Sequence, residues 1–451
     1  MKIIIVGDGK VGFTLSEQLS HEGHDVTIID NRNDVLQKSI ESLDIIAIKG
    51  NGASYDVQMK AGIDEADLLI AATSTDEVNM VCCQLGKKLG VKHTIARIRN
   101  PEYNEQLRIM KDDLGLSMIV NPEMEAAEEI ARLISFPSAL SIGSFAEGKV
   151  YIVEFRIDKE NPLIGKSISV VHGNYADDVL VCAVNRDSEA FVPHGQFILK
   201  QGDRVHIAGS YNSINAYLQS IGQHERKTKS VMIIGGGLVT YYLSEKLVGH
   251  DIRVTIIEKD LTRCEHLCEN ILGALIINGD GTDRALLDSE DMENYDAFVA
   301  LADLDEENLI MSMYAAYKGV PKIITKVNRL EFSEVIRRAG IDRIISPKNS
   351  AANRIIRYVR NMRSAKSGQI KTLYKIIDDR AEILEFTATK DTMNLGIPVA
   401  KLPLKKNVLL TTIVRNGRII IPRGKNMMLE GDTVIIVTTI AQMEDLNDIF
   451  E

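Results

Sequence analysis

The chain has 451 residues, of which 45% are hydrophobic and 26% are charged, and its formal net charge is −10. This length exceeds what a single hydrophobic core usually supports, so several domains are expected, and the acidic balance argues against general binding to nucleic acid. No apolar stretch approaches the roughly 20 residues that a transmembrane helix needs, and the N-terminus leads directly into a short apolar run, so no signal peptide is expected.

The first part of the chain alternates short runs of β-branched residues with helical stretches. Strands are predicted at residues 2–6, 25–29, 45–48, 68–71, 94–97 and 118–120, with helices between them at residues 12–20, 53–61 and 77–89. Nearly continuous apolar strands that alternate with helices are typical of a parallel sheet covered on both faces. Residues 1–135 are therefore predicted to form a doubly wound, Rossmann-like domain.

The next part has a different pattern. Residues 150–209 are rich in β-branched residues and turn signals, and a helix is predicted at residues 213–222. We therefore expect residues 136–225 to form a small, β-rich α+β domain. Residues 226–360 repeat the Rossmann-like pattern, and residues 361–451 repeat the β-rich pattern with a terminal helix at residues 441–450. The predicted fold class is α/β, with two tandem repeats of a doubly wound parallel sheet and a small β-rich domain.

The two halves repeat each other at a constant spacing. Gly235 lies 228 positions after Gly7, and Glu258 lies 228 positions after Asp30. Such a period indicates gene duplication. Because an enzyme usually needs one cofactor site beside one substrate site, two dinucleotide-type sites in tandem favour a sensor.

A glycine-rich loop follows the first predicted strand and has the sequence Gly7-Asp8-Gly9-Lys10-Val11-Gly12. The first glycine permits the tight turn, the second lets the backbone approach a pyrophosphate, and the third lets helix and strand pack closely. The helix N-terminus presents free N–H groups to the phosphates, and Lys10 could add a cation. The alternative is a purely structural glycine turn.

An acidic residue, Asp30, ends the second predicted strand, 18 residues beyond Gly12. Its carboxylate is placed to accept hydrogen bonds from both ribose hydroxyls of a dinucleotide, and it would repel a 2′-phosphate. NAD(H) is therefore favoured over NADP(H) at the first site.

The second loop has the sequence Gly235-Gly236-Gly237-Leu238-Val239-Thr240 and keeps the glycines that face phosphate. Glu258 occupies the ribose position, and Thr240 replaces the third glycine. We expect this site to bind NAD(H) or ATP/ADP. The alternative is a degenerate copy that is kept for scaffold and dimer packing.

Further residues are predicted to line the crevice at the carboxyl ends of the strands. In the first half they are Asn51, Gly52, Thr73, Ser74, Glu77 and Arg97, and in the second half Asp280, Gly281, Ala302, Asp303 and Lys326. Arg97 and Lys326 have the clearest role, because each is a cation that leaves a parallel strand toward a phosphate site. The alternative for each of these residues is a helix cap or a turn.

A basic stretch runs from Arg354 to Ile370, and its apolar residues are spaced as on one face of a helix. The simpler interpretation is a solvated helix that connects two domains. The alternative is a surface that contacts an acidic partner or lies near the membrane.

The sequence contains no Ser/His/Asp set, no HExxH motif, no P-loop lysine and no paired carboxylates beside a substrate pocket. The five cysteines have no CxxC spacing, which is typical of reduced thiols in the cytoplasm. Cys264 and Cys268 lie four apart on a predicted helix and are interpreted as packing residues. We therefore expect neither catalysis nor a metal site.

These features resemble the TrkA family, the peripheral nucleotide-binding subunits of bacterial and archaeal Trk potassium uptake systems. The layout is similar to two tandem RCK units, each a KTN domain followed by a TrkA-C domain. The resemblance covers essentially the whole chain and rests on residues 1–7 with the glycine loop, Ile28-Ile29-Asp30, Gly50-Asn51-Gly52, Ala96-Arg97 and the Gly202-Asp203 and Gly431-Asp432 turns. The chain departs from the family pattern at Asn51, where relatives often have Asp, and at Thr240.

The resemblance implies a cytoplasmic homotetramer that lies on the inner face of the cell membrane through a membrane-embedded potassium transporter subunit of the TrkH/TrkG type. Nucleotides in the KTN domains would bias the shape of a ring and so gate potassium flow. The main alternative is an RCK-type regulator of another cation channel or antiporter. A further alternative is an NAD-dependent oxidoreductase.

Overall fold

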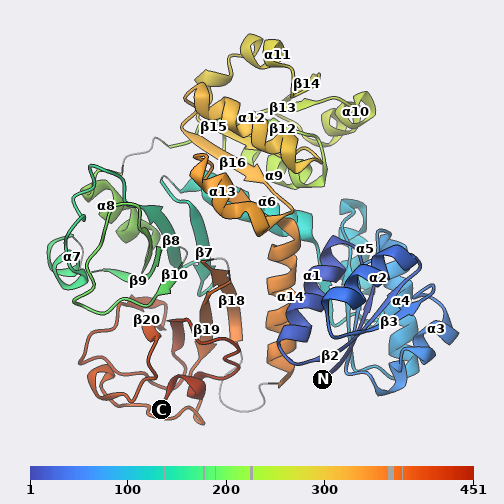
Figure 1. Ribbon diagram of the computed structural model, residues 1–451, viewed down its shortest axis with the longest axis horizontal. Coiled ribbons are helices and arrows are strands. Elements are labelled where there is room, and N and C mark those ends of the chain that lie inside the picture. Colours follow the sequence, from blue (N-terminus) through green and yellow to red (C-terminus); the bar gives the residue numbers. More distant parts are fainter. Residues whose placement is uncertain (137, 176–177, 188, 224–226, 364–369, 378) are drawn as a thin grey trace.

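Four sheets, arranged as two repeats, form the molecule (Figure 1). The computed structural model describes residues 1–451 except 137, 176–177, 188, 224–226, 364–369 and 378. In each repeat a six-stranded parallel sheet is followed by a five-stranded antiparallel sheet. The predicted fold class is confirmed.

The parallel sheet of the first repeat, with its helices, is called the first N domain. Its strands are β1 (Lys2–Val6), β2 (Asp25–Asp30), β3 (Ile46–Lys49), β4 (Leu68–Ala71), β5 (His93–Arg97) and β6 (Met118–Val120), and its helices are α1 (Lys10–His21), α2 (Asn33–Ser42), α3 (Tyr55–Lys60), α4 (Asp76–Leu89) and α5 (Asn104–Met110). The strand order is β3-β2-β1-β4-β5-β6. The order reverses between β1 and β4, which places a crevice at the carboxyl ends of these strands.

The second N domain repeats this arrangement with the order β14-β13-β12-β15-β16-β17. Its strands are β12 (Ser230–Ile234), β13 (Arg253–Glu258), β14 (Ala274–Asn278), β15 (Ala297–Ala300), β16 (Lys322–Lys326) and β17 (Arg343–Ile345), and its helices are α9 (Leu238–Val248), α10 (Leu261–Asn270), α11 (Arg284–Ser289), α12 (Asp305–Tyr317) and α13 (Ser333–Arg338). The central strands β12 and β15 are buried on both faces, which explains their continuous apolar runs.

The antiparallel sheets form two small domains. The first small domain contains β7 (Ser141–Phe145), β8 (Val150–Arg156), α7 (Ile168–Tyr175), β9 (Val179–Arg186), β10 (Glu189–Phe191), β11 (Arg204–Gly209) and α8 (Tyr211–Ser220). The second contains β18 (Ile370–Ile376), β19 (Ala381–Thr387), β20 (Val408–Arg415), β21 (Arg418–Ile420) and β22 (Thr433–Thr438). The two domains pack against each other through an apolar core that includes Ile152, Cys182, Ile383 and Val437.

The ends of the two small domains differ. The helix predicted at residues 213–222 is present as α8, but the helix predicted at residues 441–450 is wrong. The chain instead has a short 3₁₀ turn, η6 (Leu446–Ile449), which Asp445 and Asp448 hold in a capping box. A β-bridge between Leu404 and Phe450 keeps the C-terminus extended. The β-rich pattern also did not predict α7.

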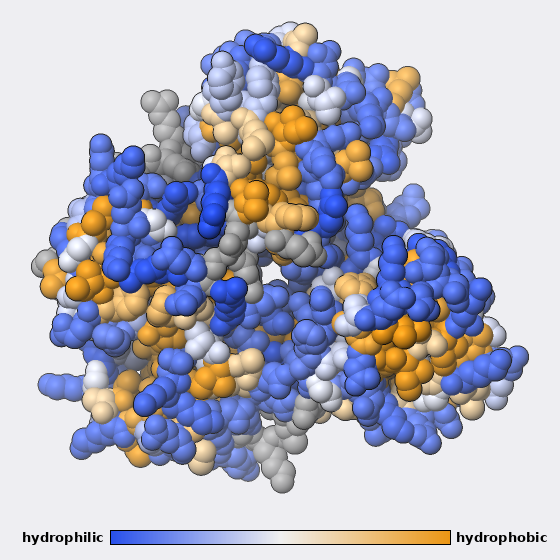
Figure 2. Space-filling model, in the orientation of Figure 1, coloured by the Kyte–Doolittle hydropathy of each residue, from blue (hydrophilic) through white to orange (hydrophobic). Residues whose placement is uncertain are grey.

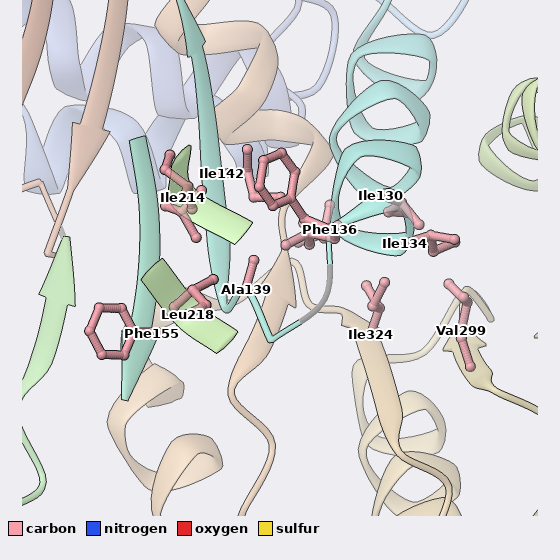
Figure 3. Packing of buried hydrophobic residues seen from close by; sticks show 14 of the residues in the cluster. Ile130, Ile134, Phe136, Ala139, Ile142, Phe155, Ile214, Leu218, Val299 and Ile324 are labelled. Atoms are coloured by element: carbon pink, nitrogen blue, oxygen red, sulfur yellow. The ribbon is translucent and has the colours of Figure 1, made fainter. Parts of the chain in front are cut away.

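Two connecting helices pack on the opposite half of the chain. The helix α6 (Pro122–Ser135) follows the first N domain but packs against α9 of the second, and α14 (Pro347–Arg363) follows the second N domain but packs against α1 of the first. Figure 3 shows Ile130 and Ile134 of α6 near Val299 and Ile324 of the second N domain. We call this arrangement the helix exchange.

The helix exchange produces two cores that each combine both halves. One core joins α6, the first small domain and the second N domain. The other joins the first N domain, α14 and the second small domain. Separating the halves would therefore expose apolar surface from every domain.

A buried lysine fastens the end of α6. The Lys322 ammonium of the second N domain donates hydrogen bonds to the carbonyls of Leu133, Ile134 and Phe136 at distances of 3.0 to 3.2 Å. The last carbonyls of a helix have no intrahelical partner and carry partial negative charge. The lysine therefore neutralises the end of α6 at its junction with the opposite half.

The basic stretch forms most of α14 and is not solvated. Arg360 is only 2% exposed, and it donates hydrogen bonds to Glu382 of the second small domain at 2.8 Å and to Glu22 of the first N domain at 3.2 Å. Arg354 pairs with Glu125 of α6. The helix connects two domains, as predicted, but the prediction that it is solvated is wrong, because carboxylates from three other segments neutralise Arg354 and Arg360.

The basic residues at the end of this stretch do not test the alternative that it contacts an acidic partner or lies near the membrane. The side chain of Arg363 and the residue Lys366 lie outside the described residues.

Arg360→Gln is expected to destabilise the chain, because it leaves the carboxylates of Glu22 and Glu382 buried without a cation. Removing one partner of a buried ion pair typically costs about 3–5 kcal/mol. Calorimetry should therefore give a clearly lower midpoint of thermal unfolding for this variant. The matched control is Arg418→Gln, which changes an exposed arginine of β21. Equal midpoints for the two variants would contradict this account of Arg360.

Candidate nucleotide-binding sites

The first glycine loop joins β1 to α1. A side chain would have a different steric effect at each of its three glycines. Gly7 has a φ of +98°, and a Cβ there would lie 2.9 Å from the backbone of Thr73. A Cβ at Gly12 would lie 1.9 Å from the carbonyl oxygen of Gly7. A Cβ at Gly9 would meet no protein atom within 4 Å. Gly9 therefore faces open space, as a loop that admits a pyrophosphate requires.

Asp30 lies at the mouth of this loop as an ionised carboxylate. It accepts hydrogen bonds from the backbone N–H groups of Asp8 at 2.8 Å and Arg32 at 2.9 Å. Burial opposes ionisation, but these hydrogen bonds and the Arg32 guanidinium outweigh it and lower the pKa of Asp30. The carboxylate is thus held in place before any ligand binds.

A crevice of about 630 Å³ opens at the carboxyl ends of the strands. The predicted residues that line it are Gly7, Gly9, Asp30, Asn51, Gly52, Thr73, Ser74 and Arg97. Arg32 also lines it and was not predicted, although its position two residues after the acidic residue is a usable signal.

Other predicted residues of the first half lie elsewhere. The carboxylate of Asp8 is buried and accepts a hydrogen bond from the Ser39 hydroxyl at 2.6 Å, so it points away from the crevice. Glu77 accepts a hydrogen bond from the Tyr103 hydroxyl. Asp8 therefore contributes only its backbone to the loop.

The second loop has the same backbone form. Gly235 has a φ of +97°, and a Cβ at Gly237 would meet no protein atom within 4 Å. Thr240, at the position of the third glycine, is fully buried, and its hydroxyl donates to the carbonyl of Gly235. Glu258 accepts from the backbone N–H groups of Gly236 and Asp260, as Asp30 does in the first half.

The second crevice is much smaller, at about 80 Å³. The predicted residues that line it are Gly235, Gly236, Gly237, Glu258, Asp280, Gly281, Ala302 and Asp303. Arg263, which was not predicted, lies 4.0 Å from Glu258 and 3.9 Å from Asp303. Its guanidinium between these two carboxylates partly fills the crevice.

A third cleft, of about 560 Å³, lies between the two N domains and receives the remaining predicted residues. Lys10 and Val11 line it from the first half, and Leu238, Val239 and Lys326 line it from the second, together with Arg97, Arg99, Arg263 and Lys348. The N-termini of α1 and α9 therefore open into one space, which we call the shared cleft.

Several lysine and arginine side chains of both halves line the shared cleft. Burial lowers the pKa of Lys326; Asp303 opposes this shift, and Lys10 of the other half adds to it. Burial likewise lowers the pKa of Arg97. An anionic group in the cleft would relieve this repulsion.

Hydrogen bonds between the halves border the shared cleft. The Tyr242 hydroxyl of α9 donates to the Arg99 carbonyl at 2.6 Å, and Asn121 donates to the same hydroxyl at 3.0 Å. The two N domains are therefore in direct contact beside the glycine loops.

No cluster of three or more residues suited to a metal ion is found among the described residues. All five cysteines are free, and only Cys268 is exposed. Burial raises the pKa of Cys82 to about 12, which makes this thiol unreactive. No helix in the described part of the chain is long and apolar enough to span a membrane.

Comparisons with known proteins find the same two domain families in each half of the chain. The TrkA-N domain model matches residues 3–122 and 231–347, and the TrkA-C domain model matches residues 152–222 and 383–451. The helices α6 and α14 lie between the matched regions.

Similar proteins match over nearly their whole length. "Trk system potassium uptake protein TrkA homolog 1" of Methanosarcina mazei is 34% identical, over 100% of both chains. "Trk system potassium uptake protein TrkA" of Haemophilus influenzae is 31% identical, over 97% of this chain and 95% of the relative. Among solved structures, the "GsuK channel bound to NAD" has a TM-score of 0.62 and 17% identity, covering 97% of this chain and 76% of that chain.

Asp8→Asn is expected to stabilise the chain in a pH-dependent way. Burial raises the pKa of Asp8 despite the hydrogen bond from Ser39, and the charge of Asp30 adds to the shift. A carboxyl whose pKa is higher in the folded state loses stability as the pH rises from its unfolded value through its folded value. The unfolding midpoint of the variant should exceed that of the parent at about pH 8, and the difference should shrink toward about pH 4. Asp44→Asn, at an exposed position, is the control, and a difference independent of pH would contradict the interpretation.

Proposed function

This chain belongs to the TrkA family of Trk potassium uptake systems, and we propose that it gates a membrane-embedded potassium transporter of the TrkH/TrkG type in response to nucleotides in its two N domains. The observation that carries the proposal is the shared cleft, where cations of both halves face one another between the two glycine loops. Phosphates at either loop would change the repulsion across the cleft and hence the relative positions of the N domains. By this mechanism the protein acts from the cytoplasmic face of the membrane.

The ligand of the first site is NAD(H) in this proposal. The open space at Gly9, the ionised Asp30 and the crevice of about 630 Å³ support it. The GsuK channel, which has the same fold, is described as bound to NAD.

The second site takes NAD(H) or ATP/ADP. Its crevice of about 80 Å³ shares Gly236, Gly237 and Arg263 with the shared cleft of about 560 Å³, and a mononucleotide needs less of this room than a dinucleotide. The size difference therefore supports a different ligand at the second site.

The relatives support a regulatory rather than catalytic role, because they are described as potassium uptake proteins. This supports a sensor over an NAD-dependent oxidoreductase.

An exposed apolar surface supports self-association, which in this proposal gives a homotetramer. Ile310 and Tyr317 of α12 are 67% and 80% exposed, and Phe332 and Val335 are 57% and 66% exposed. Figure 2 shows orange surface in the region of α12 and α13. Monomeric proteins rarely expose large contiguous apolar patches, so this face is a suitable contact between neighbouring subunits.

Gly9→Val and Gly237→Val are expected to block one site each without disturbing the fold. A Cβ at either position meets no protein atom within 4 Å, but it occupies the space of a pyrophosphate. In calorimetric titration, Gly9→Val should no longer bind NADH at the first site, and Gly237→Val should still bind it there. Unchanged NADH binding in Gly9→Val would contradict the assignment of the first loop.

The transport proposal is tested by reconstituting the full chain with its transporter partner in vesicles and measuring potassium flux. NADH should change the flux of the parent by about 5–150-fold, the range of typical allosteric coupling. Gly9→Val should associate with the transporter but give a flux that does not respond to NADH. A parent flux independent of every nucleotide tested would refute the proposal.

A further inference from the structure

A polar cavity of about 460 Å³ lies where the two halves meet, away from both glycine loops. Its walls include residues of α6, α14, β7 and β18, so both exchanged helices line it. In Figure 1, α14 runs beside the edge strand β18.

Most acidic residues of the cavity are already paired. Glu154 accepts a hydrogen bond from the Arg204 guanidinium at 3.0 Å, and Glu125 pairs with Arg354. Asp342 lies 3.4 Å from Arg156. These pairs leave little free negative charge from those three carboxylates.

Glu129 is also held by neutral groups. Its carboxyl accepts hydrogen bonds from Ser350 at 2.9 Å and Tyr374 at 3.4 Å. Burial raises the pKa of Glu129, although the charge of Arg132 and the two hydrogen bonds oppose this shift.

Two arginines of the cavity, one from each exchanged helix, form no ion pair closer than 4.0 Å among the described residues. Arg132 of α6 reaches only to 4.0 Å from Glu128, and its Nε is buried without a hydrogen-bond partner. Arg357 of α14 donates to the carbonyl of Lys371 at 2.7 Å, and no carboxylate of the described residues lies within 4.0 Å of it. Burial lowers the pKa of Arg357, and the negative charge of Glu385 only partly opposes this shift.

Neutral hydrogen-bonding groups complete the lining. The hydroxyl of Ser346 and the amide oxygen of Asn353 are buried and have no partner. The Ser346 hydroxyl can donate a hydrogen bond to an anion, whereas the Asn353 amide oxygen accepts hydrogen bonds and needs a donor such as water.

We propose that this cavity is a third ligand site, which binds a small, multiply charged anion carrying phosphate groups through Arg132 and Arg357. Guanidinium groups bind phosphate oxygens in a bidentate manner, and Arg132 and Arg357 lie on two helices that contact each other and line the same cavity. Because α6 packs on the second N domain and α14 packs on the first, the anion would connect elements in contact with both nucleotide sites.

The test is calorimetric titration of the full chain with inorganic pyrophosphate at low salt. Arg132→Gln/Arg357→Gln removes the two charges and should weaken binding at least about tenfold. Arg132→Lys/Arg357→Lys keeps the charges and should retain most of the affinity. Gly9→Val/Gly237→Val blocks both glycine loops. This variant should still bind one pyrophosphate per chain, in the cavity.

Three results would overturn the proposal. The first is the absence of pyrophosphate binding by the parent chain. The second is unchanged binding by a folded Arg132→Gln/Arg357→Gln variant, checked by circular dichroism. The third is complete loss of binding in Gly9→Val/Gly237→Val, which would assign the anion to the glycine loops. The glutamine and lysine double variants could both lose binding because both unfold at a lower temperature than the parent. In that case the single variant Arg132→Gln is titrated with pyrophosphate. Full affinity of this single variant would also refute the site.

Discussion

The apolar contact of α6 and α14 with the opposite half is the constraint on which the other features depend. Each helix follows one N domain in sequence but completes the core of the other half. Buried cations reinforce both contacts, with Lys322 at the end of α6 and Arg360 within α14. Because the cores are shared, the two N domains are held with their glycine loops on one cleft.

Much of the fold could be predicted from local pattern, because the parallel strands are nearly continuous apolar runs and each glycine loop directly follows one. The helix exchange could not be predicted, because an amphipathic pattern gives a helix an apolar face without naming the domain that covers it. For the same reason α14 was predicted to be solvated: its arginines meet carboxylates more than 200 positions away in the sequence, such as Glu125 and Glu22. The terminal turn at η6 depends on local capping by Asp445 that a short helical pattern does not reveal.

The residues of the candidate sites also fall into two groups, those that local sequence pattern predicts and those that long-range packing places. The glycines, Asp30 and Glu258 follow from motif spacing, and the structure brings them together in each half. The predicted residues Lys10, Leu238 and Lys326 lie instead in the shared cleft, since the position of one N domain against the other is a long-range property. Arg263 narrows the second crevice from a helix that the motif does not include. Two sites of common origin thus differ in the room that they offer to a ligand.

Hydrogen exchange measured by mass spectrometry tests the shared cores most directly. The experiment compares Gly237→Val with and without NADH, so that only the first loop is open. The helix exchange predicts that NADH changes protection in the first N domain, in α14 and in the second small domain, which share one core. Changes that stay within the first N domain, or that reach the first small domain without any change in α14 and the second small domain, would contradict the account.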